Sequence, residues 1–272
     1  MDEQLSTEKL SERLAVVLRT WPLYREFTYT GVADGSLPGR IRLWCPGCGT
    51  EQNWGYPSRP GTSHKTGHPT EQTYGCLNCG KCHISYNFWW GLGADKVSKF
   101  FKIGQWPALE ESIAPELEKV LEGDDVRLYK NAIRLRNFNL GLGALAYMRR
   151  VVENRMNDIL DALHESATEH KVSNRILARI ESVKAAHGFS RKIDYAALLF
   201  PENLHPKGLP NPIAALHSLT SDGLHGCSEN ECAEIFDRCK AVFEYVFASL
   251  RPSVQESKAF LRNLSKLTQK SE

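Results

Sequence analysis

Two pairs of cysteines stand at the spacing that a tetrahedral metal site requires. Cys45 and Cys48 form the first pair, Cys76 and Cys79 form the second, and a glycine follows each pair directly. Thiolates three residues apart can reach one Zn²⁺ ion from a single tight turn, and paired Cys-x-x-Cys motifs are a specific indicator of such a site. Because cysteines fill all four ligand positions, none is open for water or a substrate. The sequence therefore predicts a zinc ribbon with a structural Zn²⁺ ion.

Two further candidate ligands, Cys82 and His83, follow the second pair. Alternation along the chain places Cys82 on the same side as Ile84 and Tyr86, which predicts a buried thiol at the start of a strand. His83 falls on the opposite, polar side. A ligand swap onto either residue stays an alternative. The glycines after the pairs, Gly49 and Gly80, are expected to adopt the left-handed backbone that turns amides toward the sulfurs.

Composition narrows the class of protein. The chain has 272 residues and a formal charge of +2, so its overall charge makes no case for nucleic acid, although a local basic patch could. No run of eighteen apolar residues occurs, which predicts a protein without a membrane span or membrane partner. The chain begins without an apolar leader, and disulfides are rare in reducing compartments. We expect reduced cysteines and a cytoplasmic location.

The elements that must position the cysteines are a helix and a few strands. Apolar residues at helical spacing predict an amphipathic helix over 1–21. Alternation predicts strands over 40–44 and 82–89, on either side of the cysteine pairs. The polar stretch 52–72 is expected to be an exposed irregular loop, and 91–107 a connector with one short extended piece. The expected domain, 22–107, is a small antiparallel sheet clamped by zinc.

Helical periodicity dominates the rest of the chain. It predicts helices over 124–138, 142–163 and 176–183, and a last helix that begins at Ser228. Ser228 and Glu231 have the spacing of a capping box, and Cys232 and Cys239 lie on the apolar stripe of that helix as core residues. The predicted fold class is mainly α: an N-terminal zinc ribbon of small antiparallel β structure, followed by an α-helical bundle over 108–272.

The ribbon also carries residues that could contact nucleic acid. Aromatic rings stack on bases and basic side chains pair with phosphates. The candidates for these contacts are Arg40, Arg42, Trp54, Arg59, His64, Lys65 and Trp89. In the alternative interpretation, which we favour, the tryptophans dock the ribbon onto the helical domain.

Two stretches of the helical half carry a resemblance to a known family. The first begins at Leu128-Tyr129, continues over 141–153 and contains Arg149, Arg150 and Glu153; the second runs over 216–232 and contains His225. Together they resemble the bacterial HEPN-like helical domains of unknown function that occur beside, or fused to, restriction and phage-defence proteins. The resemblance covers about residues 110–250. It implies a bundle of four or five helices, often a homodimer, with the Arg-Arg-x-x-Glu helix near the His225 turn.

The resemblance also implies an activity to weigh. Many HEPN proteins are metal-independent ribonucleases in which an arginine precedes a histidine, with four to six residues between them. His225 would be the matching histidine, but Ser218, Leu219 and Thr220 occupy the positions of the arginine. In a rearranged site, Arg149, Arg150 and Glu153 would supply the charges, with His217 or His225 as the base. In the simpler interpretation these charges are structural or solvated.

Three functions follow from these patterns. We favour a non-catalytic module that binds nucleic acid or protein, in the setting of a bacterial phage-defence system. The second is a HEPN-type ribonuclease with a rearranged active site that uses His225. The third is a structural adaptor that binds only protein. The sequence contains no Gly-x-x-x-x-Gly-Lys loop for a nucleotide, and no further cofactor is expected.

Overall fold

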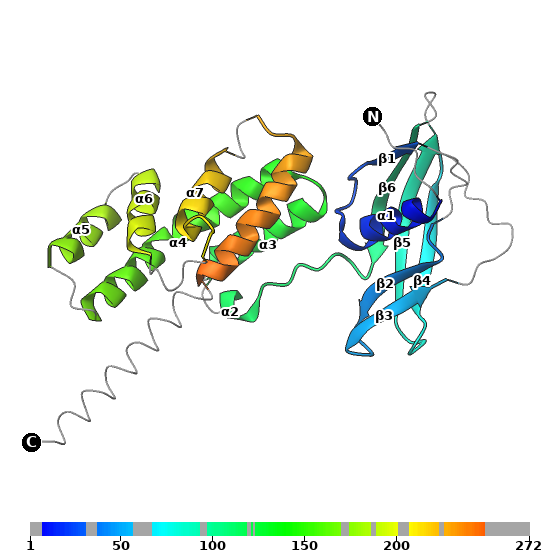
Figure 1. Ribbon diagram of the computed structural model, residues 1–272, viewed down its shortest axis with the longest axis horizontal. Helices are drawn as coiled ribbons and strands as arrows, with labels where there is room; N and C mark the ends of the chain where they lie inside the picture. Colours follow the sequence, from blue (N-terminus) through cyan, green and yellow to red (C-terminus); the bar gives the residue numbers. More distant parts are fainter. Residues whose placement is uncertain are drawn as a thin grey trace, which may run out of the picture. The chain divides into compact units, whose positions relative to one another are not determined.

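The computed structural model describes residues 7–30, 37–56, 67–92, 97–118, 121, 123–169, 174–185, 189–200, 207–222 and 226–247. The chain divides into two compact units (Figure 1). The first contains residues 1–110 together with 137–139, and we call it the sheet unit. The second contains residues 111–136 and 140–272, and we call it the helical unit.

Six antiparallel strands form a single sheet in the sheet unit (Figure 1). They are β1 (Phe27–Thr30), β2 (Arg40–Cys45), β3 (Thr50–Gly55), β4 (Pro69–Cys76), β5 (His83–Leu92) and β6 (Val97–Trp106). The order across the sheet is β1-β6-β5-β4-β3-β2, so β1 and β2 are its edges. Cross-strand pairs fix the register, for example Trp54 opposite Cys76 and Tyr74 opposite Ile84.

The first helix, α1 (Thr7–Thr20), contributes to the core of this sheet. Its buried residues Leu14, Val17 and Leu18 recur at helical spacing and belong to the same cluster as Tyr86 and Phe88 of β5. This face of the sheet is the inner face, and the opposite face is the outer face. The helix predicted over 1–21 is therefore confirmed over Thr7–Thr20, and its apolar stripe lies in the core of its own unit.

The sheet is larger than the predicted ribbon. The connector predicted over 91–107 is wrong, because β6 is a ten-residue strand that pairs with both β5 and β1. Strand β6 was not predicted because polar residues interrupt its apolar alternation. Ser98 and Lys102 occupy inward positions on either side of Phe100, and all three are buried. The loop predicted over 52–72 is also wrong at both ends, which belong to β3 and β4. The fold class is therefore mixed α and β rather than mainly α.

The helical unit follows the periodicity of its sequence. Its helices are α2 (Pro115–Glu118), α3 (Asp124–Asn137, whose last residue belongs to the sheet unit), α4 (Gly141–Glu169), α5 (Asn174–Lys184), α6 (Phe189–Leu199), α7 (Pro212–Asp222) and a last helix over 229–247. The helices predicted over 124–138 and 142–163 are confirmed, the second of them six residues longer at its end. No helix in the described ranges is both long and apolar enough to cross a bilayer.

The core of the helical unit forms around α4. Leu145, Met148, Val152 and Met156 recur every three to four residues along α4 and are all buried. The last helix adds Phe243, whose ring lies 5.9 Å from that of Tyr129 between centroids. The cysteines predicted on its apolar stripe, Cys232 and Cys239, are fully buried as expected.

The predicted capping box is present at the start of the last helix. The backbone N–H of Ser228 donates to the Glu231 carboxylate at 2.8 Å, and the backbone N–H of Glu231 approaches the Ser228 hydroxyl oxygen at 3.3 Å. These reciprocal hydrogen bonds satisfy two amides that the helix itself cannot. The Ser228 hydroxyl also donates to the Glu231 carboxylate at 2.7 Å, and this bond, followed by the one from the Ser228 backbone N–H, lowers the pKa of the Glu231 carboxyl.

Candidate metal centre

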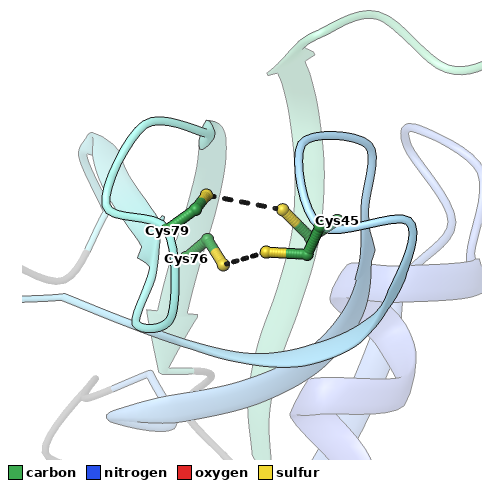
Figure 2. A group of neighbouring side chains, drawn as sticks. Cys45, Cys76 and Cys79 are labelled. Atoms are coloured by element: carbon green, nitrogen blue, oxygen red, sulfur yellow. Dashed lines mark hydrogen bonds between the residues drawn. The ribbon is translucent and has the colours of Figure 1, made fainter.

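The four cysteines of the two pairs converge on one point in the sheet unit. The sulfur atoms of Cys45, Cys48, Cys76 and Cys79 all lie within 4.8 Å of one another. We call the turns that carry the two cysteine pairs, 45–49 and 76–82, the first and second knuckle. Figure 2 shows cysteine side chains of the two knuckles pointing toward each other, with Cys45 on one side and Cys76 and Cys79 on the other. This cluster is consistent with a structural metal ion.

The distances fit a tetrahedral ion with sulfur ligands. At a zinc–sulfur bond of about 2.3 Å, the edge of the tetrahedron is about 3.8 Å. The sulfurs of Cys45 and Cys79 lie 3.7 Å apart, and those of Cys48 and Cys76 lie 3.9 Å apart. Two opposite edges of the tetrahedron thus already have the length that such a bond requires. Cys45, Cys48, Cys76 and Cys79 would hold the ion, whose chemistry there is to cross-link two turns.

Tight turns at two strand ends position these thiols. Cys45 ends β2, and its carbonyl oxygen accepts hydrogen bonds from the backbone N–H groups of Cys48 and Gly49 at 3.2 and 2.9 Å. Cys76 ends β4, and its carbonyl oxygen accepts from Gly80 at 2.9 Å. Gly49 and Gly80 have φ values of 68° and 64°, so both adopt the left-handed backbone that the sequence predicts.

Local hydrogen bonds favour a thiolate at one of the four positions. Backbone N–H groups of Lys81 and Cys82 point at the Cys79 sulfur and lower the pKa of that thiol to about 6. Burial instead raises the pKa of Cys45. The Asn78 amide donates to the Cys48 sulfur at 3.4 Å, but burial and the neighbouring thiols outweigh it and raise the pKa of Cys48. A bound cation would offset this resistance to ionisation, since thiolates are the ligands of zinc.

Of the two further candidate ligands, one lies at the cluster. A Cβ atom built on Gly47 would lie 2.9 Å from the Cys82 sulfur, 3.7 Å from that of Cys79 and 3.9 Å from that of Cys45. Cys82 is half-buried rather than buried, and it stands one residue before β5, which begins at His83. His83 is exposed on the outer face, where its ring lies over Gly75.

The residues predicted to contact nucleic acid differ in their exposure. Arg40 and Arg42 are exposed on the outer face of β2. Trp54 is 3% exposed and donates its ring N–H to the Leu43 carbonyl oxygen, so it belongs to the core and cannot stack on a base. Trp89 is half-buried and stacks on Phe101 at 5.2 Å between centroids. The other candidates, Arg59, His64 and Lys65, lie outside the described residues.

Sequence reasoning missed two exposed tryptophans on the outer face. Trp44 alternates with the two arginines of β2 and is 61% exposed, and Trp106 at the end of β6 is 72% exposed. The signal for Trp44 was present, because residues at i, i+2 and i+4 of a strand share a face. Nothing comparable marked Trp106, since the strand that carries it was not predicted.

The candidate catalytic residues of the helical unit are partly brought together. Arg149 pairs with Glu153 at 3.0 Å and lies 3.4 Å from the Thr220 carbonyl oxygen, while Arg150 is mostly exposed and lies 3.9 Å from Glu153. One turn before Thr220, the His217 ring nitrogen Nε2 lies 3.0 Å from the Ser190 hydroxyl oxygen. His225 lies outside the described residues. This arrangement fits the structural interpretation of the Arg149–Glu153 pair, and Arg149 also contacts α7, the helix that carries His217.

The chain was compared with known families, proteins and structures. Neither a protein-family model, nor a curated protein, nor a solved structure matches the chain.

Proposed function

We propose that this protein is a non-catalytic module that binds single-stranded nucleic acid, and that a structural zinc ion holds its binding strand in place. Four thiolates in tetrahedral array suit zinc, the usual ion of structural four-cysteine sites. The observation that carries the proposal is the row of Arg40, Arg42 and Trp44 on the outer face of the edge strand β2. Cys45, a member of the metal cluster, is the next residue of the same strand.

The chemistry of this row suits a flexible strand of nucleic acid. An exposed indole offers a stacking platform to any base, and guanidinium groups at alternate positions track the phosphates. Arg42 pairs with Glu51 at 3.1 Å, with both side chains more than half exposed. Such a surface ion pair contributes little stability, so a phosphate can replace the carboxylate at small cost.

A binding assay with labelled single-stranded RNA and DNA tests the proposal. Trp44→Ala should weaken binding about tenfold, because one base–aromatic stack contributes about 1–3 kcal/mol. Changing Arg40 and Arg42 together to glutamine should make the salt dependence shallower by about 1.4 in slope, since two phosphate contacts are lost. Trp106→Ala is the matched control: Trp106 is more exposed, but stands opposite Ser85 rather than beside arginines.

The outcomes separate the candidate functions. Equal binding by wild type and both β2 variants would mean that this strand does not contact the nucleic acid. Absence of binding to either nucleic acid, with folded and metal-loaded protein, would favour the adaptor that binds only protein.

A ribonuclease is the second candidate, and one observation favours it. Arg149 and Glu153 lie close to the α7 turn that carries His217, as a rearranged HEPN-type site would require. The same RNA, incubated without added metal, tests it. Cleavage that is lost in His217→Ala or His225→Ala would show that the protein is a ribonuclease. Binding without cleavage would support the non-catalytic binding module.

A further inference from the structure

A fifth sulfur lies against the four-cysteine cluster. The sulfurs of Cys82, Cys79 and Cys45 lie within 3.9 Å of one point, the position of a Cβ atom on Gly47. Cys82 stands three residues after Cys79, which in turn stands three residues after Cys76. The second knuckle therefore offers two overlapping Cys-x-x-Cys pairs, and either pair has the spacing that one metal ion accepts.

The backbone holds Cys82 inside the second knuckle. Its carbonyl oxygen accepts a hydrogen bond from the backbone N–H of Cys76 at 2.9 Å, and its own backbone N–H points at the Cys79 sulfur. Both contacts join Cys82 to members of the cluster. Its thiol is thus held beside the centre by the same turns that hold the ligands.

The absence of a side chain at Gly47 leaves room for this thiol. A Cβ atom there would approach the Cys82 sulfur to 2.9 Å, which is closer than such contacts normally come. Gly47 of the first knuckle therefore lies next to Cys82 of the second. Gly47 belongs to the turn between Cys45 and Cys48, so Cys82 faces the first knuckle directly.

We propose that Cys82 is a reserve ligand, which replaces Cys45 on the metal and gives the centre a second set of four sulfurs. This inference rests on the proposed zinc centre. In the exchange, the bond from the metal to Cys45 breaks and a bond to Cys82 forms, while the Cys82 proton passes to the Cys45 sulfur. No electron is transferred, so the exchange requires no oxidant.

Cys45 is the ligand that Cys82 can replace. The Cys82 and Cys45 sulfurs lie near the same point, 2.9 and 3.9 Å from the position of a Cβ atom on Gly47. The nearest atom to a Cβ on Gly47, in the first knuckle, would be the Cys82 sulfur, so we place the exchange at that knuckle rather than at Cys76 or Cys79. There the Cys48 sulfur has its own donor, the Asn78 amide at 3.4 Å.

Cobalt binding to the full chain tests the exchange, since Co²⁺ in a four-thiolate site has a strong thiolate-to-metal absorption band. Cys82→Ser should bind one Co²⁺ with the wild-type band, because the original four ligands remain. Cys45→Ser should also keep a four-thiolate band, and Cys45→Ser/Cys82→Ser should lose it. The matched control is Cys48→Ser, which should lose the band even though Cys82 is present.

If Cys45→Ser alone lost the band as completely as the double variant, the proposal that Cys82 replaces Cys45 would be wrong. That result differs from failure of the centre itself, in which wild-type protein would bind no metal.

Alkylation of the zinc-loaded proteins gives a second readout on the folded chain. With N-ethylmaleimide, the half-buried Cys82 should react in wild type and become protected in Cys45→Ser, because the metal then holds it. Equal reaction of Cys82 in both proteins would contradict the exchange. So would a Cys45→Ser protein that stays unfolded in excess zinc.

Discussion

The ammonium group of Lys102 donates a hydrogen bond to the carbonyl oxygen of Leu18 at 2.9 Å, although the Lys102 side chain is fully buried. A second hydrogen bond reaches the Gln105 side chain at 3.0 Å, and the ring of Tyr86 lies 5.6 Å from the ammonium nitrogen. Leu18 lies in the last turn of α1, where carbonyl groups have no partner in the helix. Lys102 thus joins the end of α1 to strand β6.

Lys102→Ala should therefore lower the free energy of unfolding of the sheet unit by about 3 kcal/mol. The change leaves a cavity and a buried carbonyl group without its donor. Lys102→Met keeps most of the volume and should cost less, about 1 kcal/mol, because only the donor is lost. All six tryptophans lie between residues 21 and 106, so tryptophan fluorescence during urea unfolding follows this unit. Wild-type stability of Lys102→Ala would contradict the joining role.

Removal of the metal should unfold the sheet unit and spare the helical unit. A strong chelator, or Cys48→Ser, should shift the tryptophan emission toward that of the unfolded chain, because the cluster links β2 to β4. Most of the helical circular dichroism should remain, since most helical residues belong to the other unit. Zinc analysis of the purified protein should give one ion per chain. Unchanged emission after complete removal of zinc would mean that the sheet folds without it.

The parts of this structure that sequence reasoning predicts are those fixed by short-range rules. The cysteine pairs, the left-handed Gly49 and the Ser228–Glu231 capping box each depend on residues within a few positions of one another. The helical unit follows in the same way, because its apolar stripe along α4 is nearly uninterrupted.

What the sequence does not reveal depends on partners far along the chain. Strand β6 was missed because Ser98 and Lys102 face inward, and the partner of Lys102 is Leu18. Trp54 was a candidate for base stacking, yet its place opposite Ile41 puts it in the core. The sequence offered Cys82 as a candidate ligand, but its place beside Gly47 requires the arrangement of the two knuckles, which no local pattern specifies.

The capping box of the last helix gives a prediction on the helical unit. Ser228→Ala should lower its free energy of unfolding by about 1 kcal/mol, because the Glu231 amide loses its side-chain acceptor. Thermal unfolding followed by circular dichroism measures the change. Ser228→Asp is the control, since its carboxylate can still accept from that amide and should restore most of the loss. Equal losses in both variants would mean that the hydroxyl acts by some route other than capping.

Gly141 gives the sharpest prediction for the helical unit. A Cβ atom there would lie 2.2 Å from the Glu229 carbonyl oxygen and 2.3 Å from the Ala233 backbone nitrogen. Both atoms belong to backbone at the start of the last helix, which cannot yield as a flexible side chain can. The Glu229 carboxylate also accepts a hydrogen bond from the Leu142 backbone N–H at 2.8 Å, so separating the helices would break a cap of α4 as well.

We expect Gly141→Ala to destabilise the helical unit by about 3 kcal/mol, in the upper range for added volume in a packed contact. Gly143→Ala, two residues along α4, is the matched control: the three atoms nearest its Cβ atom would all belong to the flexible Leu135 side chain, the first at 3.1 Å. There the better helix propensity of alanine, about 1 kcal/mol, should offset the contact and leave stability near wild type. Thermal unfolding of the two variants, followed by circular dichroism, decides the matter. Equal melting temperatures would mean that the last helix does not pack against Gly141 at this distance.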